Sequence, residues 1–336
     1  MTNPLLTPSA LEYELPPFGS IDDGHYREGF EVGMTEQKSE IATIIALGEP
    51  VTFENTVVAL ERSGATLTRV SNIFFNKSSS DTNDEIDAIE ADFAPLLSAH
   101  EDSIMLNPDL FARISWLFEN RASLGLDEDD SWLLELYYKD FVHAGAALEA
   151  DKRERLKAIN EELSTLETQF SKNVLADSND LAIVIDDEKE LAGLTKSQVA
   201  SASKAAESRG LPGKWLITMV NFTGHPLLAS LENRELREKI MKASLSKGDR
   251  GNEFDTKSIA KKMAKLRAER AALFGRKNHA EYVTSMQTSG SPENVHVMLR
   301  KIAPNARRNA QREGADLQAR ITSEGQNHDL QSWDWD

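Results

Sequence analysis

The chain of 336 residues contains no cysteine. The side chains left that could take part in catalysis are those of histidine, serine and lysine and the carboxylates. The seven histidines are His25, His100, His143, His225, His279, His296 and His328. No two of them are four residues apart, so no helix can present the paired imidazoles of the zinc-binding pattern HExxH. His100-Glu101 begins like that pattern, but Ile104 stands at its last position. We expect His100 to end a helix, where a partly protonated ring suits the helix dipole, rather than to bind a metal.

Other catalytic patterns are also missing from the sequence. No serine lies in a GxSxG pattern, and the Gly213-Lys214 pair is followed by Trp215 rather than by Ser or Thr. The lack of cysteine excludes disulfides, thiolate zinc sites and iron–sulfur clusters. Adjacent carboxylates such as Asp186-Asp187 are typical of loops and helix caps in an acidic protein. The residues therefore predict no catalytic, cofactor-binding or metal-binding site within this chain.

The charge of the chain is strongly negative, at −17, and unevenly spread. Residues 1–150 carry 8 basic and 28 acidic side chains, whereas residues 151–336 carry 30 and 27. This balance argues against partners such as nucleic acid or an anionic membrane surface. The acidic half either faces a basic surface or forms a solvated face that keeps the protein soluble.

The location of the protein is predicted from what the sequence lacks. The N-terminus has neither basic residues nor an apolar segment, so it does not resemble a signal peptide. The longest stretch without charged residues, Trp215 to Leu231, is interrupted by His225 and Pro226 and is not expected to span a membrane. We therefore expect a cytoplasmic protein.

One segment is markedly basic. Its cations are Lys257, Lys261, Lys262, Lys265, Arg267, Arg270, Arg276 and Lys277, around the single acid Glu269. Ile259, Met263 and Leu266 recur at helical spacing, which predicts an amphipathic helix with a cationic face. That face could attract an anionic ligand, such as the C-terminal carboxylate of a peptide. We favour the other interpretation, in which the helix packs against the acidic first half.

The hydrophobic periodicity predicts a mainly α fold with one small strand pair. Residues 1–20, rich in proline, are expected to form an extended arm, and residues 21–336 a helical region. A first long helix should bury one face, formed by Tyr26, Phe30, Gly33, Met34, Ile41 and Ile45. The short β-branched runs 181–185 and 215–220 are expected to be the strands.

Capping residues predict where several helices begin. Thr82 with Glu85 and Thr195 with Gln198 have the spacing of capping boxes. Asn107 before Pro108 is typical of a helix start, and Ser131 is expected to open the next helix.

Two long helices are expected in the rest of the chain. The first runs from about residue 151 to 175, with an inward seam of Leu156, Ile159, Leu163, Leu166, Phe170 and Val174. The second spans residues 292–323, with Val295, Met298, Leu299, Ile302, Leu317 and Ile321 on one face. Pro304 should kink this second helix or leave one of its backbone hydrogen bonds unmade.

Several strings, taken in order along the chain, resemble a known family. They are Phe53-Glu-Asn-Thr56 with Ala59-Leu60-Glu61, Ala94-Pro95 to His100, Leu106-Asn-Pro108, Leu124-Gly-Leu-Asp127, Asn233-Arg-Glu-Leu-Arg-Glu238, Leu266-Arg-Ala-Glu-Arg-Ala271, Leu273-Phe-Gly275, His279-Ala280 and Trp333-Asp-Trp335. Together they resemble the N-terminal half of a bacterial peptidyl-dipeptidase, Dcp, in the thimet oligopeptidase and oligopeptidase A family of zinc metallopeptidases.

This resemblance implies a largely helical ellipsoid split by a deep channel. The N-terminal half would form a wall that admits only short peptides, and the other half would carry HExxH and the zinc ion. Members like Dcp release dipeptides from the C-termini of oligopeptides. Because the present chain stops at Asp336, before the family's zinc-binding and catalytic residues, none of those residues can be assigned here.

The resemblance therefore implies a chain truncated before the catalytic zinc domain. Its expected partners are short peptide substrates and the missing C-terminal catalytic half, and zinc is expected only in the full-length family member. We expect the 336-residue chain alone to be inactive. The alternative is a non-catalytic helical scaffold or a peptide-binding module.

Overall fold

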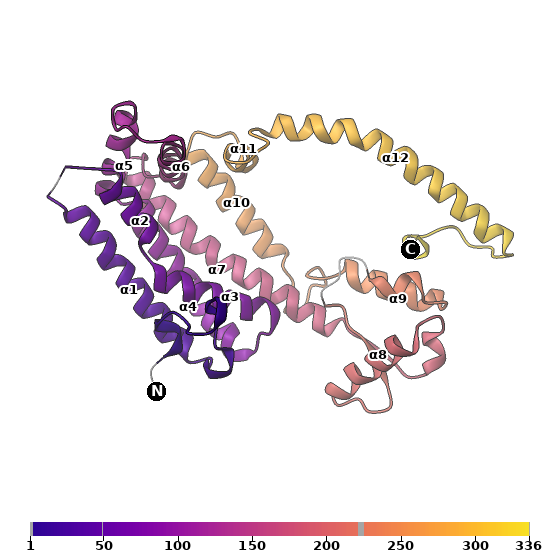
Figure 1. The fold of residues 1–336 in the computed structure, drawn as a ribbon. Coiled ribbons are helices and arrows are strands. Elements are labelled where there is room, and N and C mark those ends of the chain that lie inside the picture. The colour runs from indigo at the N-terminus through magenta and orange to yellow at the C-terminus, as the bar shows by residue number, and fades with distance from the viewer. Residues whose placement is uncertain (1–2, 49, 221–224, 336) are drawn as a thin grey trace. The chain divides into compact units, whose positions relative to one another are not determined.

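The computed structural model describes residues 3–48, 50–220 and 225–335 (Figure 1). The chain forms two compact units, one of residues 1–168 with 266–277 and one of residues 169–265 with 278–336. Both units are mainly helical, which confirms the predicted fold class. Among the described residues, no helix combines the length and the apolar character needed to cross a membrane.

The first unit is a bundle of helices preceded by an arm of short turns. Its helices are α1 (His25–Ala46), α2 (Ala59–Arg62), α3 (Ala65–Ser80), α4 (Asp84–Met105), α5 (Pro108–Asn120) and α6 (Glu128–Ala144). Parts of two further helices, α7 (Ala150–Asp180) and α10 (Lys257–Leu273), complete it. The described part of the predicted arm forms 3-10 turns at Pro4–Leu6, Glu12–Glu14 and Phe18–Ser20, while residues 1 and 2 lie outside the described residues. The domain boundary after residue 20 stays a prediction.

Aromatic rings from three helices form one core of this unit. Phe30 of α1 stacks on Phe93 of α4, with ring centroids 5.0 Å apart. Phe74 of α3 meets Tyr26 and Phe30 edge to face, at 5.2 and 5.1 Å. Such geometries suit the charge distribution of the rings and add to the burial of their surface. The predicted inward face of α1 is confirmed along the helix, because Ile41 near its end is also buried and Ile45 packs against a core cluster.

The seam predicted for the long helix α7 is largely confirmed. Leu156, Ile159, Leu163 and Leu166 are all buried, whereas Phe170 and Val174 are half-buried. Spacings of three and four residues place these side chains along one stripe of the helix. The stripe is buried from Leu156 to Leu166 and only partly covered beyond that.

Two helix starts differ from their predicted positions. The N-cap of α4 is Asn83, whose Oδ1 accepts from the backbone N–H groups of Glu85 and Ile86 at 3.0 Å. The capping box predicted for Thr82 is therefore wrong by one residue. Helix α6 begins at Glu128 after the N-cap Asp127, three residues before the predicted Ser131. In each case an Asx side chain caps the helix in place of the nearby hydroxyl.

The other two predicted starts are confirmed. Asn107 caps α5, with Pro108 as the first helical residue. Thr195 and Gln198 form a capping box at the start of α8 (Lys196–Ser208), in which each side chain bonds to the backbone of the other residue.

The second unit contains the predicted strand pair, although both strands are shorter than the predicted runs 181–185 and 215–220. Strands β1 (Ile183–Ile185) and β2 (Trp215–Ile217) pair antiparallel, with Val184 opposite Leu216. Its helices are α8, α9 (Arg234–Leu245), α11 (His279–Thr284) and α12 (Pro292–Ser323), with the remaining parts of α7 and α10. A core of Ile185, Leu191, Ile217, Met219, Leu228, Leu231, Leu236 and Ile240 lies between the strand pair, the turns and α9.

Helix α12 has the predicted bounds, but its predicted inward face is not buried. Met298, Leu299 and Ile302 are each at least half exposed, and no described residue of this helix is fully buried. Pro304 lies inside the helix, which continues past it. The periodicity identified a true apolar stripe, but only its two ends, at Val295 and at Leu317 and Ile321, are half-buried.

Helices α1 and α3 approach each other at Gly33. An added Cβ there would lie 2.8 Å from the Cα of Leu67, which is backbone and cannot rotate away. Gly33→Ala should therefore lower the free energy of unfolding by about 1–3 kcal/mol, although alanine is the better helix former. Chemical denaturation should measure this loss, and Gly19→Ala, which meets nothing within 4 Å, is the control. A Gly33→Ala variant as stable as the parent would contradict this close packing.

Candidate functional site

The histidines that sequence analysis considered do not gather at one place. Among the described residues, no group of three or more His, Asp or Glu side chains could hold a metal ion. Some rings instead cap the backbone: His25 Nδ1 accepts from the N–H of Asp22 at 2.9 Å. His225 Nδ1 accepts from the N–H of Leu227 at 3.3 Å, at the start of the turn Pro226–Ala229.

His100 is a buried structural residue. It lies within α4, which continues to Met105, and only 5% of its surface is exposed. Its Nε2 lies 2.7 Å from the Oε1 of Gln37 on α1. Burial lowers the pKa of the ring, so it is neutral near pH 7. The expectation of a partly protonated ring at a helix end is therefore wrong, because the helix continues and the ring is desolvated.

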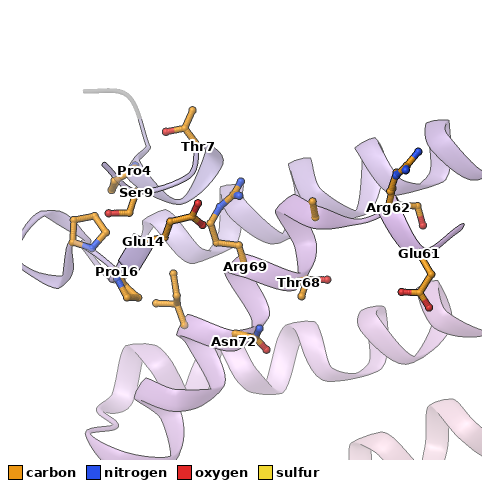
Figure 2. A pocket seen from close by; sticks show the side chains of 14 residues that line it. Pro4, Thr7, Ser9, Glu14, Pro16, Glu61, Arg62, Thr68, Arg69 and Asn72 are labelled. Atoms are coloured by element: carbon orange, nitrogen blue, oxygen red, sulfur yellow. The ribbon is translucent and has the colours of Figure 1, made fainter. Parts of the chain in front are cut away.

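A pocket of about 440 Å³ lies in the first unit, between the N-terminal arm and the start of α3 (Figure 2). It is lined by Pro4, Thr7, Ser9, Glu14, Pro16, Pro17, Glu61, Arg62, Ser63, Ala65, Thr68, Arg69, Asn72 and Ile73. The arm is held by Arg69, whose Nε donates to the carbonyl of the buried Leu5 at 2.9 Å. Asn3 Nδ2 also donates to the carbonyl of His25 at 2.8 Å. These contacts make the arm a wall of the pocket.

The arm is conformationally strained beside this pocket. Tyr13 and Glu14 both have positive φ, 57° and 54°, in the left-handed region that disfavours residues with a Cβ. Tyr13 is 87% exposed, while Glu14 lines the pocket. Residues in such conformations persist where the surrounding structure dictates them, and they occur often at binding sites.

The pocket offers charged groups that could bind a ligand. Arg69 and Glu14 supply opposite charges (Figure 2). Two of its hydroxyls are engaged locally: Ser63 Oγ donates to the carbonyl of Leu60 at 2.8 Å, and Ser9 Oγ accepts from the N–H of Leu11 at 3.1 Å. The lining includes no imidazole that could activate them. The arrangement therefore suits a polar ligand that carries both charges.

Sequence reasoning missed this pocket. The prolines of the arm indicated a rigid extended segment, but nothing in the sequence showed which helix the arm covers. Asn3 before Pro4 indicates only the local turn at the start of the arm, where Asn3 Oδ1 accepts from the N–H of Leu5 at 3.0 Å.

A buried carboxylate forms a second polar cluster in the first unit. Asp102 of α4 is 9% exposed, and the Nδ2 of Asn160 on α7 donates to both of its oxygens, at 2.9 and 3.2 Å. Arg270 Nη1 of α10 donates to the Oδ1 of Asn160 at 3.4 Å. Burial raises the pKa of Asp102 to about 6, although the hydrogen bond from Asn160 opposes this rise.

Asp102 should make stability depend on pH. Its pKa of about 6 in the folded chain lies above the usual value of 3.8, so the folded state holds the proton of Asp102 more tightly than the unfolded state does. The stabilisation is fully present below about pH 3.8 and is lost as the pH rises through about 6, on the order of 3 kcal/mol in total.

We expect Asp102→Asn to flatten this dependence, measured as the free energy of unfolding in urea between about pH 4 and pH 7. The exposed Glu119→Gln should keep the slope of the parent. If the free energy of unfolding changes with pH by the same slope in the parent and in Asp102→Asn, then the pKa of Asp102 is the same in the folded and unfolded chains.

The basic run forms the predicted amphipathic helix, α10, with Ile259, Met263 and Leu266 buried. Glu269 pairs with Arg155 of α7 through two contacts, at 2.6 and 2.8 Å. Arg267 pairs with Glu167 of α7 at 2.7 Å. These ion pairs join α10 to α7. The ring of Phe274, directly after α10, has its centre 6.4 Å from that of His143 on α6, and residues 266–277 belong to the same unit as residues 1–168. The predicted packing against the acidic first half is therefore confirmed for this end of the basic segment.

A buried ion cluster joins the end of the chain to α9 in the second unit. Asp334 accepts from Arg234 Nη2 at 2.8 Å and from Arg237 Nη2 at 3.0 Å, and its side chain is 4% exposed. Burial alone would raise the pKa of Asp334, but the hydrogen bonds from the two guanidinium groups hold it below its usual range. The Arg234 guanidinium also lies 5.5 Å from the ring centre of Trp333.

Comparison with known proteins identifies relatives for the whole chain. Residues 227–336 match the profile "Peptidase family M3". The chain is 37% identical to the dipeptidyl carboxypeptidase of Escherichia coli and to that of Salmonella typhimurium, over 99% of this chain and 49% of each relative. It is 28% identical to oligopeptidase A of Escherichia coli, again over 99% of this chain and 49% of the relative.

These similarities confirm the resemblance predicted from the sequence. The chain spans about half the length of the curated relatives it matches. Two of the strings that carried the resemblance, 233–238 and 333–335, meet in the ion cluster of Asp334.

Proposed function

We propose that this chain, which is related to the M3 peptidases along almost its whole length, is the N-terminal half of a zinc metallopeptidase. The complete enzyme would remove dipeptides from the C-termini of short oligopeptides in the cytoplasm. The observation that carries the proposal is the similarity to dipeptidyl carboxypeptidases across both units.

The proposed role of this half is to form the wall that limits substrate size. The Asp102 and Asp334 clusters support such a role, because buried polar contacts in both units join segments that are far apart in the sequence. Buried aromatic and aliphatic cores would keep the wall rigid. A rigid wall excludes large substrates without taking part in the reaction.

The zinc ion does not fit the residues of this chain that the structure describes. Their His, Asp and Glu side chains form no cluster of three that could hold a metal ion. We therefore assign no step of the reaction to these residues. In the proposed enzyme the zinc ligands and the residue that activates the metal-bound water belong to the half that this sequence does not include.

The proposal predicts the behaviour of the isolated chain. The purified 336-residue chain should hold no stoichiometric zinc and cleave no peptide. A fusion that adds the half of the Escherichia coli relative unmatched by this chain should release C-terminal dipeptides. Metal analysis and chromatography of the products measure both, and a chelator should abolish the cleavage. Chelator-sensitive cleavage by the isolated chain, or a folded but inactive fusion, would contradict the proposal.

A second candidate function is a peptide-binding module without catalysis. The pocket beside the arm favours it, because Arg69 and Glu14 offer partners for the carboxylate and ammonium ends of a short peptide. If this function is correct, Arg69→Met should weaken binding of short peptides by the isolated chain about tenfold or more in calorimetric titration. Arg27→Met, at an exposed ion pair with Asp92, should leave binding unchanged. No measurable binding by the parent chain would exclude this candidate.

A further inference from the structure

Helix α12 of the second unit exposes a long stretch of its side chains. Every residue from His296 to Glu313 is exposed. The large apolar side chains among them are Val297 (57% exposed), Met298 (54%), Leu299 (50%) and Ile302 (54%). Clustered apolar exposure of this kind marks an interaction surface more often than a solvated one.

The apolar residues of α12 form one defined stripe. Val295, Leu299, Ile302, Ala306 and Ala310 recur every three or four residues and so share one face of the helix. The alanines would let another helix or strand approach closely. The opposite side carries Arg300, Lys301 and Arg308 together with Val297.

The same stripe is covered at the other end of the helix by the chain itself. Leu317 and Ile321 are half-buried there. Gln318 Nε2 donates to the carbonyl of His328 at 3.1 Å, and its Oε1 accepts from the N–H of Leu330 at 2.7 Å. A Cβ on Gly314 would lie 3.2 Å from the ring of Trp335. The returning segment thus covers the stripe from Gly314 onward and leaves the earlier part open.

An open stripe of this length needs a partner. Isolated helices are marginal in water, and most helix stability in proteins comes from burying an apolar face. Residues 296–313 bury none of their side chains, although they continue a helix that is covered at its end. The uncovered stripe therefore requires a second apolar surface, with the basic side left toward solvent.

We propose that the exposed part of this stripe, Leu299, Ile302, Ala306 and Ala310 with Met298 beside it, is the docking surface for the half of an M3 peptidase that this sequence does not include. Two observations select this occupant. The relatives are about twice as long as this chain, and α12 lies within residues 227–336, which match the M3 profile. This inference rests on the proposed function, because it names where the two halves of that enzyme meet.

Cysteine labelling tests the surface directly, since the chain has no cysteine of its own. Ile302→Cys places a thiol on the stripe, and Val297→Cys places a matched thiol on the opposite side of the same helix, at nearly equal exposure. Each variant is labelled with a maleimide as the isolated chain and within the fusion to the remaining half of the Escherichia coli relative. Mass spectrometry of the peptide that carries residue 302 or 297 measures each rate.

The expected result is fast labelling of both positions in the isolated chain. In the fusion, Ile302→Cys should react at least ten times more slowly, while Val297→Cys keeps its rate. Equal labelling of the two positions in the fusion overturns the proposal. So does protection of Ile302→Cys in the isolated chain, because a second copy or another part of this chain would then cover the stripe.

The same samples separate this inference from the proposed function. An active fusion in which Ile302→Cys stays reactive disproves the docking surface and leaves the peptidase assignment intact. A protected Ile302→Cys in a fusion that cleaves no peptide supports the docking surface and contradicts the peptidase assignment.

Discussion

Burial of the apolar seam of α7 is the constraint around which the first unit is built. Leu156, Ile159 and Leu163 are buried along one stripe, so the flanks of that stripe lie beside neighbouring helices. On those flanks Asn160 reaches Asp102 of α4, and Arg155 reaches Glu269 of α10. The polar contacts between segments far apart in the sequence thus follow from where the seam is buried.

In the second unit, the end of the same helix shows how a buried charge is accommodated. Asp177 is completely buried and accepts from the backbone N–H of Gly248 at 2.7 Å and from Nε of Arg250 at 2.8 Å. Burial would raise the pKa of this carboxyl, but the hydrogen bonds from Arg250, Gly248 and Asn252 lower it instead. A fully bonded carboxylate fixes the loop that leads into α10, whereas Asp102 has only an amide partner in the described structure and holds its proton up to about pH 6.

The sequence predicted most helix bounds and apolar stripes correctly, because both depend on residues that are close together in the sequence. Asn107 before Pro108 and Thr195 with Gln198 cap as predicted. At the start of α4 the N-cap is Asn83 and not the predicted Thr82. Both residue types can cap a helix, so the sequence does not show which of two adjacent candidates does so. Burial is a different kind of property. The period of α12 identified its stripe but not what covers it, and the sequence around His100 could not show that Gln37 and neighbouring helices desolvate the ring.

The pocket beside the arm was outside the reach of sequence reasoning for the same reason. Its walls come from residues 4–17 and 61–73, which nothing local links to each other. The link is the hydrogen bond from Arg69 to the carbonyl of Leu5, a backbone acceptor that any residue could have supplied. Side-chain patterns in a sequence cannot predict such a contact.

The ion cluster of Asp334 explains why α12 is covered at one end and open at the other. Two guanidinium groups hold a nearly inaccessible carboxylate, and removing one partner would leave charge buried without compensation. The segment around Trp333 is therefore held on α9, and Trp335 and Leu330 are kept against Gly314 of α12. Because residues 330–335 are held by these contacts with α9 and with Gly314, they cannot also cover Leu299 and Ile302. The open part of the stripe thus needs a surface from elsewhere, which is what a relative of twice the length would supply.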